Sequence, residues 1–102
     1  MLASFAVIPV GEGEELQEHI AAIVELIDAS GLPYKLGAMQ TTLEGDQSQV
    51  MDVIMRCHNL MRERTSRVLT SITIDDRKGA VDRLEGKVRD VETVLGRKVN
   101  HE

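Results

Sequence analysis

YKLGAMQTTLEG, residues 34–45, predicts a short hairpin between two amphipathic helices. Its arms, 34–36 and 40–44, have the composition of strands, and Gly37 with Ala38 supplies the turn between them. Thr41, Thr42 and Glu44 make the second arm the densest group of uncharged and acidic hydrogen-bonding side chains on any predicted strand. The hairpin therefore fixes the order of the elements and marks the place to look for a ligand.

Upstream of the hairpin, the pattern predicts one strand and one helix. Residues 2–9 are almost continuously apolar and are interrupted only by Ser4, as in a central strand that is covered on both faces. From Glu14 onward, apolar residues recur at helical spacing. Gly31 followed by Pro33 predicts the end of this helix.

Downstream of the hairpin, the pattern predicts a second helix and a fourth strand. Asp46 is an expected N-cap, and Gln49 follows three residues later, as in a capping box. Residues 67–74 read as a strand. The apolar stripe of the second helix is expected to contain Val50, Val53, Ile54, Cys57 and Met61.

A third helix is predicted to begin at Asp75-Asp76 and to end at Gly96, which leaves residues 97–102 as a frayed tail. We expect the two aspartates to cap this helix rather than to form a catalytic pair. The element order is then β-α-β-β-α-β with an additional C-terminal helix. This order predicts an α+β, ferredoxin-like sandwich with a four-stranded antiparallel sheet, in one domain over residues 1–96.

Composition limits the partners of the chain. With 102 residues and a formal charge of -5, it is a single domain that is poorly suited to a phosphate backbone. Phe5 and Tyr34 are the only aromatic residues, so the third strand has no ring on which a base could stack. The N-terminus lacks a basic leader, and no stretch approaches the roughly 20 apolar residues that span a bilayer. We predict a cytoplasmic protein.

Strand alternation assigns side chains to the two faces of the predicted sheet. If Phe5 and Leu43 face the helices, Ser4, Thr42 and Glu44 face the opposite, open side. The open side then carries small, apolar and hydroxyl residues, whereas a solvated face normally carries more charge. We predict that another subunit covers this side, with the third helix supplying part of the cover within or between chains.

Glu44 is the first candidate ligand-binding residue, because a carboxylate beside hydroxyl groups can hold a small planar cation. The alternative is a solvated residue at the end of a strand. Tyr34 would stack on a ligand ring, or is an ordinary half-buried aromatic residue. Cys57 is more typical of a core residue than of a nucleophile. No catalytic residue and no metal site is predicted, because the three histidines lie on separate elements without suitably spaced partners.

The chain resembles the family of small thiamine-binding proteins, whose members are single ferredoxin-like domains or tandem copies of one. Ala38 stands where the family usually has a proline, which implies a looser hairpin turn. The resemblance runs nearly end to end and rests on Tyr34, Leu36, Gly37, Met39, Thr41, Leu43, Glu44 and Gly45, on Asp75-Asp76-Arg77, and on Leu84, Lys87, Val88, Val91, Glu92, Leu95 and Gly96.

The resemblance implies non-catalytic binding of thiamine or its hydroxymethylpyrimidine part, no required cofactor, and a homodimer or homotetramer formed through the sheet faces. Carried over to this chain, Thr41, Thr42 and Glu44 become the expected ligand contacts, and strand geometry adds Ser4 and Tyr34. Three alternatives stay open. They are a regulatory module that senses amino acids, a small oligomeric enzyme such as a cofactor-free oxygenase, and a structural oligomer without a ligand.

Overall fold

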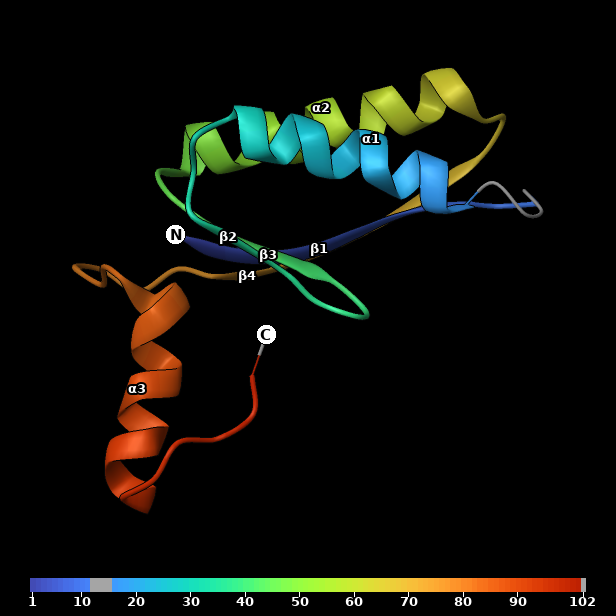
Figure 1. Cartoon of the computed structure of the whole chain (residues 1–102). Coiled ribbons are helices and arrows are strands. Elements are labelled where there is room, and N and C mark those ends of the chain that lie inside the picture. Colours follow the sequence, from blue (N-terminus) through green and yellow to red (C-terminus); the bar gives the residue numbers. More distant parts are fainter. Residues whose placement is uncertain (12–15, 102) are drawn as a thin grey trace.

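The computed structural model describes residues 1–11 and 16–101. Its strands form one antiparallel sheet in the order β2-β3-β1-β4, and helices α1 and α2 cover one face of that sheet (Figure 1). This arrangement confirms the predicted ferredoxin-like sandwich. The elements are β1 (Leu2–Pro9), α1 (Leu16–Ala29), β2 (Tyr34–Leu36), β3 (Thr41–Glu44), α2 (Gln47–Arg64), β4 (Val68–Asp75) and α3 (Arg83–Leu95).

The hydrophobic core lies between the sheet and the two covering helices. Phe5 of β1 and Leu43 of β3 point into it, as strand alternation predicts, and Ile27 of α1 meets them from above. The whole predicted stripe of α2 is buried, because residues at helical spacing present one face to the sheet. That stripe comprises Val50, Val53, Ile54, Cys57 and Met61.

Local signals set the ends of α1 and α2 as predicted. The backbone N–H of Asp46, the N-cap of α2, donates to Oε1 of Gln49 at 3.4 Å. Gly31 follows α1 with a φ of +77°, a left-handed conformation that glycine adopts without a steric cost. The predicted start of α1 at Glu14 lies outside the described residues.

The predicted start of α3 at Asp75-Asp76 is wrong. Asp75 is the last residue of β4, and the helix begins eight positions further along at Arg83, after Asp82 in the N-cap position. Asp75 therefore caps no helix. Asp82 has a left-handed conformation with a φ of +54°, and its side chain makes no capping hydrogen bond, so no local capping signal marked this start.

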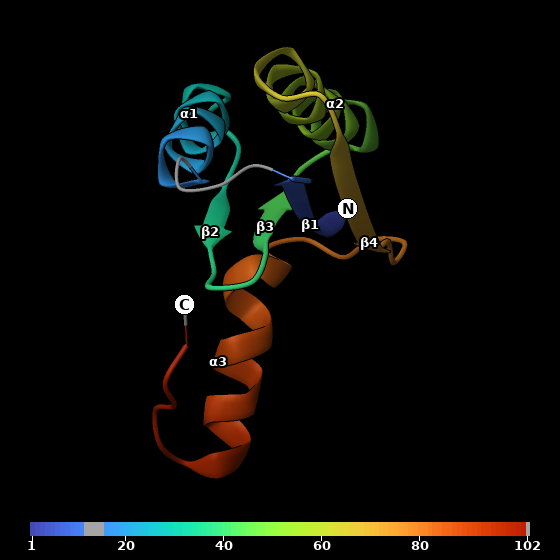
Figure 2. The same cartoon turned by 90° about the vertical axis from the view of Figure 1, so that its right-hand side faces the viewer.

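Helix α3 projects from the face of the sheet opposite to α1 and α2 (Figures 1 and 2). It meets the sheet through its N-terminal turn and contacts β3, so it covers only one end of the open face. Ile8 and Leu69 on this face remain exposed. Beyond Gly96 the chain turns back, and the N–H of Val99 donates to Oε2 of Glu92 at 2.8 Å, so the expected frayed tail is anchored at this point.

Candidate functional site

A row of polar side chains crosses all four strands on the open face. Lys35 of β2 pairs with Thr42 of β3, Thr42 pairs with Ser4 of β1, and Ser4 pairs with Thr73 of β4. Directly paired residues of antiparallel strands point to the same face. The register therefore places three hydroxyl groups and one ammonium group side by side on the surface that α1 and α2 leave uncovered.

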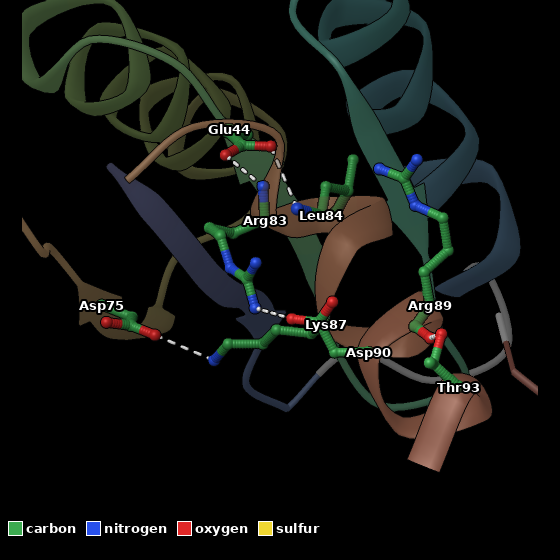
Figure 3. Close-up of polar contacts among 8 residues, drawn as sticks. All are labelled: Glu44, Asp75, Arg83, Leu84, Lys87, Arg89, Asp90 and Thr93. Atoms are coloured by element: carbon green, nitrogen blue, oxygen red, sulfur yellow. Dashed lines mark hydrogen bonds and ion pairs between the residues drawn. The ribbon is translucent and has the colours of Figure 1, made fainter. Parts of the chain in front are cut away.

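The neighbouring row contains Glu44, Leu2 and Asp75, and its carboxylates hold α3. Oε2 of Glu44 accepts the backbone N–H of Arg83 at 2.8 Å, and Oε1 accepts that of Leu84 at 3.0 Å (Figure 3). These amides belong to the first turn of α3 and have no acceptor within the helix. Glu44 thus supplies from a distant strand the negative charge that stabilises a helix N-terminus.

Two ion pairs connect α3 to the sheet. Nζ of Lys87 lies 2.8 Å from Oδ2 of Asp75, and Nζ of Lys35 lies 2.8 Å from Oε1 of Glu85. The hydrogen bond from Lys87, with its positive charge, lowers the pKa of Asp75. The bond and charge of Lys35 lower the pKa of Glu85 in the same way. All four side chains are at least partly exposed, so these pairs orient the helix more than they stabilise it.

A cavity of about 350 Å³ lies between these rows and α3, in the size range of small-molecule sites. Its wall combines the three hydroxyl groups of the polar row, apolar side chains from both the sheet and the helix, and charges of both signs. The lining residues are Leu2, Ser4, Lys35, Thr42, Thr73, Asp75, Arg83, Leu84, Lys87 and Val88.

Three of the five predicted ligand-binding residues lie together at this cavity. Ser4 and Thr42 line it directly. Glu44 lines an adjoining hollow of about 70 Å³ that shares Leu2, Asp75 and further residues with the cavity. The two oxygens of Glu44 are already engaged by α3, so its observed role is to hold the cavity wall in place.

Thr41 and Tyr34 lie on the other face of the sheet. Thr41 pairs with Phe5, a core residue, and is itself buried. Tyr34 pairs with Leu43 and donates its hydroxyl hydrogen to Oδ1 of Asp28 on α1 at 3.2 Å. Because consecutive strand residues point to opposite faces, the side chains of these two residues point away from those of Ser4, Thr42 and Glu44. Tyr34 and Glu44 nevertheless both line a further hollow at the edge formed by β2. The predicted set of five is therefore not one site.

Sequence reasoning missed four charged residues of the cavity, Lys35, Asp75, Arg83 and Lys87. Alternation along the hairpin could have found Lys35, because it points to the same face as Thr42. The residues from α3 left no such signal, since the sequence does not encode the direction in which the helix leaves the sheet.

Within the described ranges, 1–11 and 16–101, His, Cys, Asp and Glu side chains form no group of three or more that could hold a metal ion. None of the helices in these ranges is both long and apolar enough to cross a membrane.

Fold and cavity together define a ferredoxin-like domain with a small-molecule-sized cavity on the open face of its sheet. The chain belongs to the thiamine-binding protein family, whose model matches residues 3–92. A UPF0045 protein from Mycobacterium bovis is 37% identical over 96 residues, which cover 93% of this chain and 94% of the relative. A UPF0045 protein from Staphylococcus xylosus is 35% identical over 100 residues, which cover 92% and 94%.

Solved structures with this architecture agree with the family assignment. A hypothetical protein from Methanocaldococcus jannaschii matches with a TM-score of 0.81 and 27% identity over 88% of this chain and 93% of the other. A Thermotoga maritima protein, proposed to act in thiamine biosynthesis or salvage, matches with a TM-score of 0.78 and 28% identity over 88% and 96%. The family predicted from the hairpin motif is thereby confirmed.

Proposed function

We propose that the open-face cavity binds thiamine or its hydroxymethylpyrimidine part and performs no chemistry on it. The observation that carries this proposal is the row of three hydroxyl groups, from Ser4, Thr42 and Thr73, beneath the apolar side chains of Leu84 and Val88. Such a surface offers hydrogen bonds along one side of a planar ring and apolar contact on the other. Membership of the thiamine-binding family supports the choice of ligand.

The charges at the cavity suggest how a thiamine cation would be held. Asp75 is the carboxylate in the cavity lining, and it is bonded to Lys87. A thiazolium ring would compete with Lys87 for this carboxylate, and the hydroxyl row would orient the aminopyrimidine. Glu44 would act indirectly by fixing the first turn of α3 over the ligand.

Binding without catalysis is consistent with the residues that line the cavity. They include no histidine or cysteine, and their one carboxylate, Asp75, is bonded to Lys87 rather than to a hydroxyl group that it could activate. We infer that the protein requires no cofactor and that it binds and orients its ligand. A cytoplasmic location would suit this role and stays a proposal.

A second copy of the chain is the proposed cover of the open face. Ile8 and Leu69 are exposed apolar side chains on this face, and Val91 and Leu95 are exposed apolar side chains on α3, which projects from it. Burying them against a symmetry mate would close the cavity toward solvent and give a homodimer or homotetramer.

Calorimetric titration with thiamine and with hydroxymethylpyrimidine tests the function. Thr42→Val should raise the Kd by about 2- to 10-fold, because a neutral hydrogen bond contributes roughly 0.5–1.5 kcal/mol. Thr41→Val is the matched control, since it makes the same change one residue away on the opposite face, and it should leave the Kd unchanged. Absence of binding to either compound would refute the ligand, and equal effects of both variants would refute the cavity.

An amino acid is the second candidate ligand, because charges of both signs line the cavity. Lys87 or Lys35 could bind a carboxylate, while Asp75 could bind an ammonium group. The same calorimeter can separate the two functions: binding of an amino acid, with no heat from either thiamine compound, would favour a regulatory sensing module. No heat from any of these ligands would favour a structural oligomer.

A further inference from the structure

The hollow of about 70 Å³ beside the proposed ligand cavity has a cationic lining. Its side chains include those of Arg77, Arg83 and Lys87, together with the carboxylates of Glu44 and Asp75. Positive charge thus gathers here, although the chain as a whole has a formal charge of -5. In an acidic protein, a local excess of cations around a concave surface indicates a site for an anion.

The two carboxylates of the hollow have partners of their own. Asp75 is paired with Lys87, and the oxygens of Glu44 accept the backbone N–H groups of Arg83 and Leu84. Because both carboxylates are compensated in this way, neither presents an unpaired negative charge that would exclude an anion.

Arg77 is the cation of the hollow that has no partner. Arg83 is bonded to Asp90 at 2.9 Å and Lys87 to Asp75 at 2.8 Å (Figure 3), whereas no hydrogen bond or ion pair within residues 1–11 and 16–101 engages the guanidinium group of Arg77. The pKa of Asp75 is lowered first by the hydrogen bond and charge of Lys87 and then by the charges of Arg77 and Arg83. All three cations therefore act on one carboxylate, and they are close enough together to act on one anion.

The hollow adjoins the ligand cavity. The two spaces share the lining residues Leu2, Asp75, Arg83 and Lys87. Arg77 lines only the hollow, whereas the row of hydroxyl groups lines only the cavity. A ligand that is held on the hydroxyl row can therefore extend past Asp75 toward Arg77.

The size and charge of the hollow suit a phosphoryl group. One water molecule needs about 10–15 Å³, so the hollow has room for a compact group of several atoms. Phosphate oxygens accept the paired N–H groups of a guanidinium in a bidentate geometry. A phosphate monoester carries a charge of about −1.5 to −2 at pH 7, so it can pair with more than one of the three cations.

We propose that the site prefers a phosphate ester of its ligand, thiamine monophosphate, whose phosphoryl group binds in the hollow against Arg77 and Lys87. This inference rests on the proposed function, because it leaves the rest of the molecule in the cavity. The order of groups along the ligand matches the order of partners along the site. The aminopyrimidine lies on the hydroxyl row, the thiazolium lies against Asp75, and the phosphoryl group, which is attached beyond the thiazolium, reaches the hollow.

Binding of this ester exchanges one ion pair of the protein for two ion pairs with the ligand. The thiazolium takes the place of Lys87 at Asp75, and the released ammonium group pairs with the phosphoryl group. Both side chains of the Lys87–Asp75 pair are 55% exposed, so separating them costs little. Unphosphorylated thiamine supplies the cation without the anion, and it leaves Lys87 without a partner.

Calorimetric titration of the full chain with thiamine, thiamine monophosphate and inorganic phosphate tests this preference. We expect the Kd of the monophosphate to be roughly 10- to 100-fold lower than that of thiamine, because hydrogen bonds to charged groups are stronger than neutral ones. Inorganic phosphate should bind far more weakly than the monophosphate, since it gains no contact with the cavity.

The three ligands also separate the ways in which the inference can fail. Equal Kd values for thiamine and its monophosphate would overturn the phosphate site and leave thiamine binding intact. No heat from either compound would refute the proposed function together with this inference. Inorganic phosphate that binds as tightly as the monophosphate would identify a site for the free anion and would overturn the preference for an ester.

Two variants in the loop between β4 and α3 locate the phosphoryl group. Arg77→Gln removes the guanidinium of the hollow, while Lys78→Gln removes an equal charge from a neighbour that lines neither space. Both residues are exposed, so both variants should fold. Arg77→Gln should raise the Kd of thiamine monophosphate about 10-fold or more, whereas Lys78→Gln should change it by less than about 2-fold, because salt screens an exposed charge. Equal effects of the two variants would overturn the placement of the phosphoryl group in the hollow.

Discussion

At the scale of single residues, Glu44 has the largest structural consequence for the candidate site. Its two oxygens accept the N–H groups of Arg83 and Leu84, which lie 39 and 40 positions away in the sequence. A carboxylate that receives two backbone hydrogen bonds at a helix N-terminus is favoured both by the bonds and by the helix dipole. One side chain on β3 thus determines where α3 meets the sheet.

Glu44→Ala should loosen α3 without unfolding the sheet. Losing a cap costs about 1–2 kcal/mol, so amides in the first turn of α3 should exchange with deuterium about 5- to 30-fold faster. Amides of β1 should be unaffected. Glu63→Gln, a change at an exposed carboxylate of α2, is the control. Unchanged exchange at Arg83 and Leu84 in Glu44→Ala would contradict the capping role.

Core packing predicts that truncating a buried aliphatic residue lowers the free energy of unfolding far more than truncating an exposed one. Ile54 is 0% exposed on the stripe of α2, whereas Val94 of α3 is 88% exposed. Ile54→Ala should lower the free energy of unfolding by about 2–5 kcal/mol, because it leaves a cavity in the core. Val94→Ala should change it by less than about 0.5 kcal/mol. Urea denaturation of both variants checks this, and similar losses in the two would contradict the observed placement of α3.

At the scale of elements, α3 differs from α1 and α2 in how it is held. The first two helices bury apolar stripes against the sheet, but α3 contacts the sheet by its first turn and leaves Val91 and Leu95 exposed. Its remaining connections to the sheet in the described part of the chain are the pairs Lys87–Asp75 and Lys35–Glu85. These two ion pairs therefore help to set the position of α3 relative to the sheet.

Acid should weaken the docking of α3. The pKa of Asp75 is lower in the folded chain than its ordinary value, because Lys87 bonds to its charged form. The contribution of this pair to stability is therefore complete above about pH 4 and is lost as the pH falls through the lowered pKa. The pKa of Glu85, lowered by Lys35, acts in the same direction.

Carbon-13 NMR titration of the carboxyl groups measures these pKa values directly. Lys87→Met should return the pKa of Asp75 to its ordinary range and leave that of Glu85 unchanged. Lys98→Met, which removes a cation from the C-terminal segment, should move neither. If Asp75 titrates alike in wild type and Lys87→Met, the ion pair does not form in solution.

At the scale of the whole molecule, the two faces of the sheet differ in cover. The helix face is closed by α1 and α2, while α3 meets the open face at one end through its N-terminal part (Figure 2). Exposed apolar side chains remain on the open face at Ile8 and Leu69. An uncovered apolar sheet face is the usual mark of an interaction surface.

Leu69→Lys should disrupt the proposed contact between open faces, because burying an unpaired ammonium group is costly. Sedimentation equilibrium should give a smaller mass than wild type, and the midpoint of urea unfolding measured on dilute protein should change little. Glu18→Lys, on α1 and therefore on the covered side, should keep the wild-type mass. A wild-type mass for Leu69→Lys would argue that the open face is not an interface.

Local patterns were sufficient for most of the fold. Strand β1, the hairpin, the capping of α2 by Asp46 and Gln49, and the buried stripe of α2 are predicted because each depends on residues close together in the sequence. The family follows from short motifs in the hairpin, at Asp75-Asp76-Arg77 and along the C-terminal helix, each of which is also local. Alternation also placed Ser4, Thr42 and Glu44 on the open face correctly, since the period of a strand is two.

The candidate site depended on tertiary structure. Helix α3 begins at Arg83, where Glu44 of β3 caps it from about 40 positions away. One ion pair, Lys35–Glu85, joins residues about 50 positions apart, and the other, Lys87–Asp75, crosses the turn before α3. No local periodicity in the sequence records such contacts. Thr41 was grouped with Thr42 by a shared motif, but the sheet sends their side chains to opposite faces. The sequence by itself determined which segments become strands and helices, because hydrogen bonding and burial within each element are local. Only the packing of distant elements decided which side chains meet in the cavity.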